Sequence, residues 1–386
     1  MSKKGADTKR QEFLTGSGHS VDDILAEATE VFGVSTTAFD EVSVFSTGNV
    51  ILDSLIGVGG IPRGRICELY GPPSSGKTTT ALQAAVSAQD QGHRIVYADF
   101  ENDLDEDYCT ALGLDTSREA GFIHVEPPSL EKGANLMRAL FRADDPPALF
   151  IVDSVAAMTT DAEAEKDTGD RSGVAERARL MAQFLRQSRG IIKQANVALV
   201  FINHVQEKID MSPMGQQMAR RGIKQYTTPG GEALKFYSSL RMQYKQTTTR
   251  KAEVMSEITN ASEKQAVATQ VKVKTIKNKL APPNREAEVT VRYGLGFSQS
   301  QAVLDVLKSY GVVKVKTGGW HIFPPSLVPT VGEDGQMMVR GKMEDDGSFK
   351  VQGEDTAFEA LITDREWTER CTEYATQIMA EAKETP

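Results

Sequence analysis

The chain has 386 residues, of which 40% are apolar and 25% are charged, and its formal net charge is −9. This composition is typical of globular proteins, so it excludes wholesale disorder, and the length predicts two domains. No apolar run reaches the roughly 18 residues of a membrane helix, and the charged first residues lack the apolar core of a secretory signal. Three cysteines at unrelated spacings exclude a disulfide framework and a zinc motif. We therefore expect a cytoplasmic protein that does not contact membranes.

The first predicted element is a short helix over residues 20–33, with Ser20 at its N-cap and Gly33 after its end. Strands and helices then alternate along the chain. The pattern predicts strands over 65–70, 93–98, 148–152 and 197–202, and helices that begin at 78 and cover 130–141 and 174–193. Nearly continuous apolar strands that alternate with helices indicate a parallel sheet covered by helices on both faces.

The pattern changes after about residue 235. It becomes rich in alternating β-strands, as in 270–276 and 287–293. A smaller acidic α+β unit begins near 299, and predicted helices over 300–310 and 364–383 frame it.

Charge is unevenly distributed along the chain. Residues 203–292 carry 16 Lys or Arg against 8 Asp or Glu, whereas residues 332–386 carry 6 against 14. A basic middle and an acidic end fit a site for a polyanion beside a segment that discourages indiscriminate contact. Ordinary solvated surface is the alternative.

Residues 71–78, Gly-Pro-Pro-Ser-Ser-Gly-Lys-Thr, fit the phosphate-binding pattern G-x-x-x-x-G-K-[ST] between a strand and a helix. Glycines let successive backbone N–H groups turn inward around phosphate oxygens, and the helix N-terminus favours negative charge. Lys77 is expected at the β- and γ-phosphates, and the Thr78 hydroxyl at Mg²⁺. A chance glycine-rich turn is the alternative.

Two carboxylates follow apolar strands and so are candidates for the same site. Asp153 directly follows the strand 148–152 and is expected to face the metal, although it could merely cap the next helix. Glu101 follows the strand 93–98, at the sheet edge where open α/β sheets bind ligands. It could orient a water for hydrolysis, or it could be surface in an acidic loop.

Together these residues resemble the RecA family of recombinases. The resemblance covers about residues 40–297 and is weaker at 31–33 and 318–320. It implies a RecA-type P-loop ATPase core with a largely parallel sheet between helices over 41–297. A short N-terminal helical arm for polymerisation would occupy 1–40, and a small acidic α+β C-terminal domain 298–386. The motifs that carry the resemblance are 46–48, 59–66, 71–78, 152–157, 201–203, 230–237 and 276–279.

The resemblance also implies roles in the nucleotide site. Glu101 matches the glutamate that activates water. Tyr108 matches the aromatic residue that stacks on adenine, although without the resemblance it would be interpreted as a core tyrosine. Lys277 and Lys279 match the pair that reaches the γ-phosphate of the neighbouring protomer. Without the resemblance they would be interpreted as ordinary surface lysines. With Lys77 and His204 they complete the expected catalytic set. The ATP-binding set is Gly71, Pro72, Ser74, Ser75, Gly76, Lys77, Thr78, Thr79, Tyr108 and Asp153, with Thr78 and Asp153 at Mg²⁺.

Two DNA-facing loops are implied, at about 166–175 and 208–229. Arg179 and Arg186, in the helix after the first loop, match arginines near the DNA path, although a solvated helix face is the alternative. The second loop carries cations that could contact DNA phosphates and apolar side chains that could enter between bases. A disordered loop with no role in DNA binding is the alternative. Lys235 and Phe236 match interface residues. The implied DNA-binding set is Arg179, Arg186, Lys208, Met211, Met214, Arg220, Arg221, Lys224, Gly230 and Gly231.

The resemblance implies a DNA-dependent ATPase that polymerises on single-stranded DNA, pairs it with homologous duplex and exchanges strands. Its implied partners are single- and double-stranded DNA, further copies of itself in a helical filament, and single-strand-binding and loader proteins. A ring-forming motor of the same fold and a catalytically weak ATP-gated mediator are the alternatives. His204 stands where bacterial members carry Gln, and the second loop is long. Both features favour a phage or otherwise divergent member.

Overall fold

The computed structural model describes residues 25–26, 41–165, 173–207, 226–255, 262–330, 337 and 339–384. The chain divides into two compact units, Met1–Val42 and Ser43–Pro386. Of the helix predicted over 20–33, only Leu25 and Ala26 are described, and both are helical. The rest of the predicted arm lies outside the described residues. The second unit holds the sheets and the candidate site.

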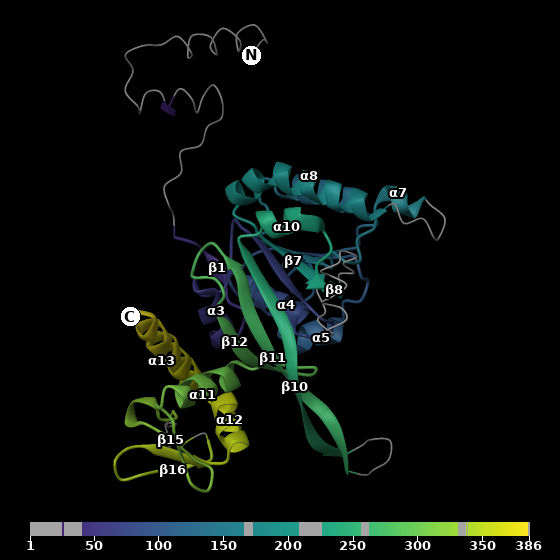
Figure 1. Ribbon diagram of the computed structural model, residues 1–386. Helices are drawn as coiled ribbons and strands as arrows, with labels where there is room; N and C mark the ends of the chain where they lie inside the picture. Colours follow the sequence, from purple (N-terminus) through teal and green to yellow (C-terminus); the bar gives the residue numbers. More distant parts are fainter. Residues whose placement is uncertain are drawn as a thin grey trace, which may run out of the picture. The chain divides into compact units, whose positions relative to one another are not determined.

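A nine-stranded sheet forms the centre of this unit, in the order β13-β12-β11-β10-β3-β7-β6-β4-β5 (Figure 1). The six strands from β10 to β5 are parallel, and β10 to β13 pair antiparallel. The predicted largely parallel sheet is therefore confirmed. Its strands are β3 (Ile66–Gly71), β4 (Ile95–Asp99), β5 (Phe122–Val125), β6 (Leu149–Asp153), β7 (Ala198–His204), β10 (Leu240–Met255), β11 (Ser262–Asn278), β12 (Glu286–Arg292) and β13 (Gly296–Phe297).

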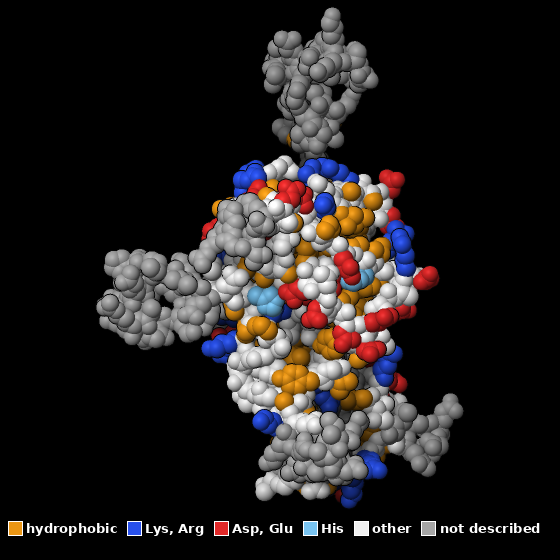
Figure 2. Space-filling view, turned by 90° about the vertical axis from the view of Figure 1, so that its right-hand side faces the viewer, with side chains coloured by type: hydrophobic (Ala, Val, Ile, Leu, Met, Phe, Trp, Pro, Cys, Tyr) orange, Lys and Arg blue, Asp and Glu red, His pale blue; other side chains and the backbone are white. Residues whose placement is uncertain are grey.

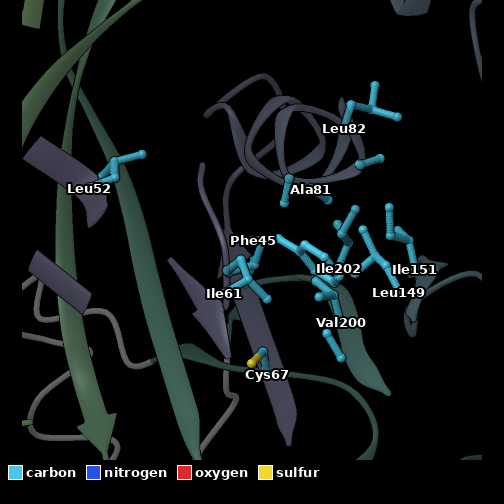
Figure 3. Packing of buried hydrophobic residues seen from close by; sticks show 14 of the residues in the cluster. Phe45, Leu52, Ile61, Cys67, Ala81, Leu82, Leu149, Ile151, Val200 and Ile202 are labelled. Carbon is cyan, nitrogen blue, oxygen red and sulfur yellow. The ribbon is translucent and has the colours of Figure 1, made fainter. Parts of the chain in front are cut away.

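Helices cover both faces of the sheet, because side chains along each strand alternate between two buried clusters. In β6, Leu149 and Ile151 join the cluster beneath α4 (Lys77–Asp90), and Phe150 and Val152 join the opposite one. Figure 3 shows the first cluster, where Leu149 and Ile151 lie close to Ala81 and Leu82 of α4. The helices on the second face are α6 (Leu130–Leu140), α8 (Gly173–Gln194) and α10 (Gly231–Tyr237), and α3 (Val50–Ile56) and α5 (Glu106–Ala111) contribute to the first cluster.

Short elements complete the core region. The strands β1 (Val44–Phe45) and β2 (Ile61–Pro62) pair with each other, as do β8 (Gln206–Glu207) and β9 (Tyr226–Thr227). The helix α7 (Asp161–Ala164) begins after Thr160, whose side chain forms a capping box with Glu163. Among the described helices, none combines the length and apolar character that crossing a membrane requires.

The strands β10 and β11 extend well beyond the stretches in which they pair with β3 and β12. β10 pairs with β3 only over its first four residues, and β11 pairs with β12 only between Ala268 and Lys274. The remaining residues pair with each other as a two-stranded ribbon that continues past the sheet (Figure 1). The strand predicted over 270–276 is thus one part of a longer element.

Beyond β13 lies the α+β segment that the sequence predicts. Trp367 lies at its centre and is fully buried, with its ring centroid 4.8 Å from that of Phe323, and its indole N–H donates to the Leu327 carbonyl at 3.0 Å. Because Val50 of α3 belongs to the same buried cluster, the boundary after residue 297 stays a prediction. The elements are α11 (Gln299–Ser309), β14 (Lys314–Lys316), β15 (Trp320–Phe323), η1 (Pro325–Leu327), β16 (Lys342–Met343), β17 (Phe349–Gln352), α12 (Glu354–Thr363) and α13 (Arg365–Glu384).

Candidate active site

The predicted phosphate loop lies between β3 and α4, as its spacing requires. Ser74 and Gly76 have φ values of 54° and 84°, and left-handed residues of this kind turn neighbouring N–H groups toward one concave side. A Cβ at Gly71 would lie 2.5 Å from the Tyr244 carbonyl oxygen, so only glycine fits there. The Ser75 hydroxyl donates to the Pro72 carbonyl at 2.7 Å and holds the turn closed.

Lys77 begins α4 and is only 4% exposed. Its ammonium donates to the Pro72 carbonyl oxygen at 2.8 Å. Burial lowers the pKa of Lys77 to about 8, while the carboxylates of Asp153 and Glu101 act in the opposite direction. A buried cation at the N-terminus of a 14-residue helix creates a strongly positive point, which is suited to an anion such as a phosphate.

Asp153 ends β6 and faces the phosphate loop. Its Oδ2 accepts hydrogen bonds from the Thr78 hydroxyl at 2.9 Å and from the Tyr97 hydroxyl at 2.8 Å. Burial raises the pKa of Asp153, and the bond from Tyr97 opposes this. Asp153 caps no neighbouring helix, because the next helix, α7, has Thr160 at its N-cap. The metal-facing alternative is the one that this geometry supports.

The donor atoms fit magnesium bound together with a nucleotide. A hydroxyl and a carboxylate are oxygen ligands, which Mg²⁺ prefers. Within the described part of the chain, no group of three or more His, Cys, Asp or Glu side chains could hold a metal ion by itself. Mg²⁺ usually takes one or two protein ligands and completes its shell with phosphate oxygens and water, so this sparse set agrees with a metal that arrives with the triphosphate.

Glu101 lies at the same sheet edge, on a loop organised by a buried carboxylate. The backbone N–H groups of the four residues from Glu101 to Leu104 donate to Asp99 at 2.7–3.2 Å. The Glu101 Oε1 accepts hydrogen bonds from the Ser154 hydroxyl and from His204 Nε2, the latter at 3.0 Å. The bond from His204 lowers the pKa of Glu101, so its carboxylate is ionised at neutral pH. Glu101 and Ser154 follow the ends of β4 and β6, and His204 ends β7, so three neighbouring strands of the sheet bring these residues together.

Tyr108 lies on α5 beside the phosphate loop. Its hydroxyl is 2.7 Å from the Thr79 hydroxyl, its ring is half-buried against the core, and burial raises its pKa. Stacking on adenine stays a prediction. The start of α5 is acidic on its surface: Asp103 and Asp105, which precede the helix, and Glu106, its first residue, are all exposed. Figure 2 shows carboxylates gathered on the face that α5 helps to form.

Lys277 meets Lys235 and Phe236, which are distant from it in sequence. Its ammonium donates to the carbonyl oxygens of Lys235 at 2.8 Å and of Phe236 at 2.6 Å, so it caps the C-terminus of α10. Burial lowers the pKa of Lys277, and Lys279 adds to the effect. Phe236 is 69% exposed and Lys279 is also exposed. The predicted contact of Lys277 and Lys279 with a neighbouring protomer stays a prediction.

A buried polar network links three strands behind the site. The Glu68 carboxylate accepts from the Asn203 amide at 3.0 Å and from Arg241 Nε at 2.5 Å. Asn203 also donates to the Pro229 carbonyl at 2.9 Å, and its own side-chain oxygen accepts from the His204 backbone N–H at 3.0 Å. This network was not predicted from the sequence, although Glu68, which lies between apolar residues of the predicted strand 65–70, was a signal for it.

Four of the ten predicted DNA-binding residues lie in the described part of the chain. Arg179 and Arg186 are exposed on α8, and Arg179 lies 3.9 Å from Glu176. Gly230 and Gly231, with φ values of 89° and 73°, form the turn that starts α10. The remaining six, Lys208, Met211, Met214, Arg220, Arg221 and Lys224, lie outside the described residues, as do most of the two predicted loops.

Comparison with known proteins gives a consistent result. The family model of the RecA N-terminal domain matches residues 26–298. Protein RecA of Lactobacillus delbrueckii subsp. bulgaricus is 38% identical over 314 residues, which are 78% of this chain and 87% of that protein. Protein RecA of Lactiplantibacillus plantarum is 36% identical and covers 82% of this chain and 79% of its own length. For protein RecA of Staphylococcus aureus the identity is 39%, with 73% and 74% covered.

Among solved structures, the crystal structure of the RadB recombinase matches with a TM-score of 0.46 and 22% sequence identity. The match covers 66% of this chain and 98% of that chain.

Proposed function

Because this chain belongs to the RecA family of recombinases, we propose that it polymerises on single-stranded DNA, pairs it with homologous duplex and exchanges strands while hydrolysing ATP. The observation that supports the proposal most strongly is a convergence of side chains at one sheet edge. Lys77, Thr78 and Asp153 meet there, and the Glu101 carboxylate lies beside them. These are the groups that hydrolysis of a nucleoside triphosphate requires.

ATP would bind with its phosphates at the loop 71–78. The Lys77 ammonium would exchange the Pro72 carbonyl for phosphate oxygens, and backbone N–H groups at the start of α4 would donate to them. Thr78 and Asp153 would hold Mg²⁺, which would neutralise phosphate charge when bound. Tyr108, whose hydroxyl is hydrogen-bonded to the Thr79 hydroxyl, would line the adenine side of the site.

Glu101 would orient the attacking water and accept its proton. A carboxylate whose pKa is held low is ionised and ready to accept, although it is a weak base, so orientation contributes more than basicity. His204 and Ser154 fix the direction of its free oxygen. Hydrolysis would remove the γ-phosphate near His204 and so change the contacts of that ring.

Filament formation would complete the site. Lys277 and Lys279 of one protomer would add positive charge to the γ-phosphate bound by the next, as an arginine finger does. To reach that phosphate, Lys277 would have to break its hydrogen bonds to the two carbonyl oxygens of α10. The loss of these two bonds would add to the free-energy cost of assembly. Phe236, largely exposed in the isolated chain, would pack in the same interface.

DNA would be held mainly through its phosphates, by exposed arginines of α8 and by the cations of the loop 208–229. Binding should then weaken with salt and depend little on sequence. We further propose that the protein works in the cytoplasm, and that single-strand-binding and loader proteins assist it there.

Hydrolysis and pairing test this proposal together. Lys77→Ala should abolish DNA-stimulated ATP hydrolysis and the formation of displacement loops with homologous duplex. The matched control is Lys132→Ala, because Lys132 is an exposed lysine on α6 whose only described ion-pair partner is Asp161 at 3.6 Å. Undiminished activity of Lys77→Ala in both assays would refute the assignment. ATP hydrolysis by the wild-type protein that DNA does not stimulate would instead favour the alternative of a catalytically weak ATP-gated mediator.

A further inference from the structure

Tyr97 places a phenol hydroxyl on the carboxylate at the centre of the site. The residue lies in β4, is 2% exposed, and belongs to the buried cluster beneath α4. Its hydroxyl donates to Asp153 Oδ2 at 2.8 Å, from one strand to its neighbour in the sheet. A buried tyrosine hydroxyl needs a partner, but a backbone carbonyl would serve that need as well as a carboxylate.

The same oxygen of Asp153 is held from two directions. Thr78, at the start of α4, donates to Oδ2 at 2.9 Å, and Tyr97 donates to it from β4. Two hydroxyl donors on one oxygen fix the rotation of the carboxylate plane about its last bond. The described residues provide no hydrogen bond to the other oxygen, Oδ1, which is therefore left available to a ligand.

We propose that Tyr97 is a positioning residue for the magnesium-bound nucleotide, acting through the orientation of Asp153. The inference rests on the proposed function, since it concerns the metal that the nucleotide would bring. Groups that hydrogen-bond to a metal-ligating carboxylate orient it, and their removal typically weakens metal binding 10- to 100-fold. The Tyr97 ring packs near Phe122, with centroids 6.3 Å apart, and a phenylalanine would preserve that packing. The hydroxyl can therefore be tested separately from the ring.

The test is Tyr97→Phe, with Tyr244→Phe as the matched control. Tyr244 is 1% exposed and lies in the same buried cluster, and its hydroxyl bonds to Thr80 at 3.0 Å, not to Asp153. Binding of a fluorescent ATP analogue would be titrated with Mg²⁺ for both variants and the wild type, beside a series in EDTA. Thermal unfolding of both variants measures the cost of losing a buried hydroxyl.

For Tyr97→Phe we expect the Mg²⁺ concentration at half-saturation to rise about tenfold, with unchanged affinity in EDTA. Tyr244→Phe should match the wild type in both series. In an Asp153→Asn background, Tyr97→Phe should add no further shift.

An unchanged Mg²⁺ titration for Tyr97→Phe, or an equal shift in Tyr244→Phe, would overturn the positioning role while leaving the proposed function intact. Failure of the wild-type protein to bind the analogue at any Mg²⁺ concentration would overturn both.

Discussion

Replacement of Lys77 by methionine should stabilise the protein in the absence of nucleotide. The pKa of this buried ammonium falls from an ordinary 10.5 to about 8. Since one pKa unit corresponds to about 1.4 kcal/mol, holding the charged form in the folded protein costs about 3 kcal/mol at pH 7. Lys77→Met removes that cost and keeps the length of the side chain, but the Pro72 carbonyl loses one of its two hydrogen bonds and keeps the one from Ser75, a loss that costs about 1 kcal/mol. We expect a net gain of about 2 kcal/mol.

The assay is urea unfolding of wild type and Lys77→Met at several pH values without nucleotide. The unfolded chain keeps the Lys77 proton up to about pH 10, while the folded chain releases it near pH 8. The unfolded state therefore binds more protons in this window, and the free energy of unfolding of the wild type should rise across it. The advantage of the variant should shrink over the same pH range. A variant no more stable than the wild type at pH 7 would refute the argument that the lysine is a destabilising charge kept for binding phosphate.

Three further predictions concern other parts of the site. Glu68→Gln should lower the free energy of unfolding by about 3 kcal/mol, because it leaves a buried guanidinium without its counter-charge; urea unfolding measures this, and an unchanged midpoint would contradict it. His204→Ala should move the acidic limb of the pH profile for ATP hydrolysis to higher pH, because the bond that lowers the pKa of Glu101 is lost; an unmoved limb would exclude that bond from the mechanism. Arg220→Ala combined with Arg221→Ala should reduce the salt slope of single-stranded DNA binding by about two, and an unchanged slope would remove both residues from the interface.

Local patterns made much of this fold predictable from the sequence. The phosphate loop needs particular residues at fixed spacing, and the strands of the parallel sheet are short apolar runs between helices, so both are readable without tertiary information. Asp153 and Glu101 were identifiable as strand-end carboxylates for the same reason. The short polar strand β14 (Lys314–Lys316) and the ribbon end of β10 carry no such pattern, and neither was predicted.

Contacts between distant residues account for what the sequence left open. Glu68 and Arg241 are 173 positions apart, and they meet because β10 returns beside β3. Tyr97 reaches Asp153 because β4 and β6 are neighbours in the sheet although they are not consecutive in the chain. The capping of α10 by Lys277 depends on the register of β11 against β10. Strand order is a tertiary property, and the periodic pattern of one strand does not encode which strand lies beside it.

Electron microscopy of the full chain with single-stranded DNA, Mg²⁺ and a slowly hydrolysed ATP analogue tests the central claim most directly. The account predicts continuous helical filaments that follow the DNA, with nucleotide density between Lys77 of one protomer and Lys277 of the next. Isolated protomers on the DNA, or closed rings around it, would contradict the account.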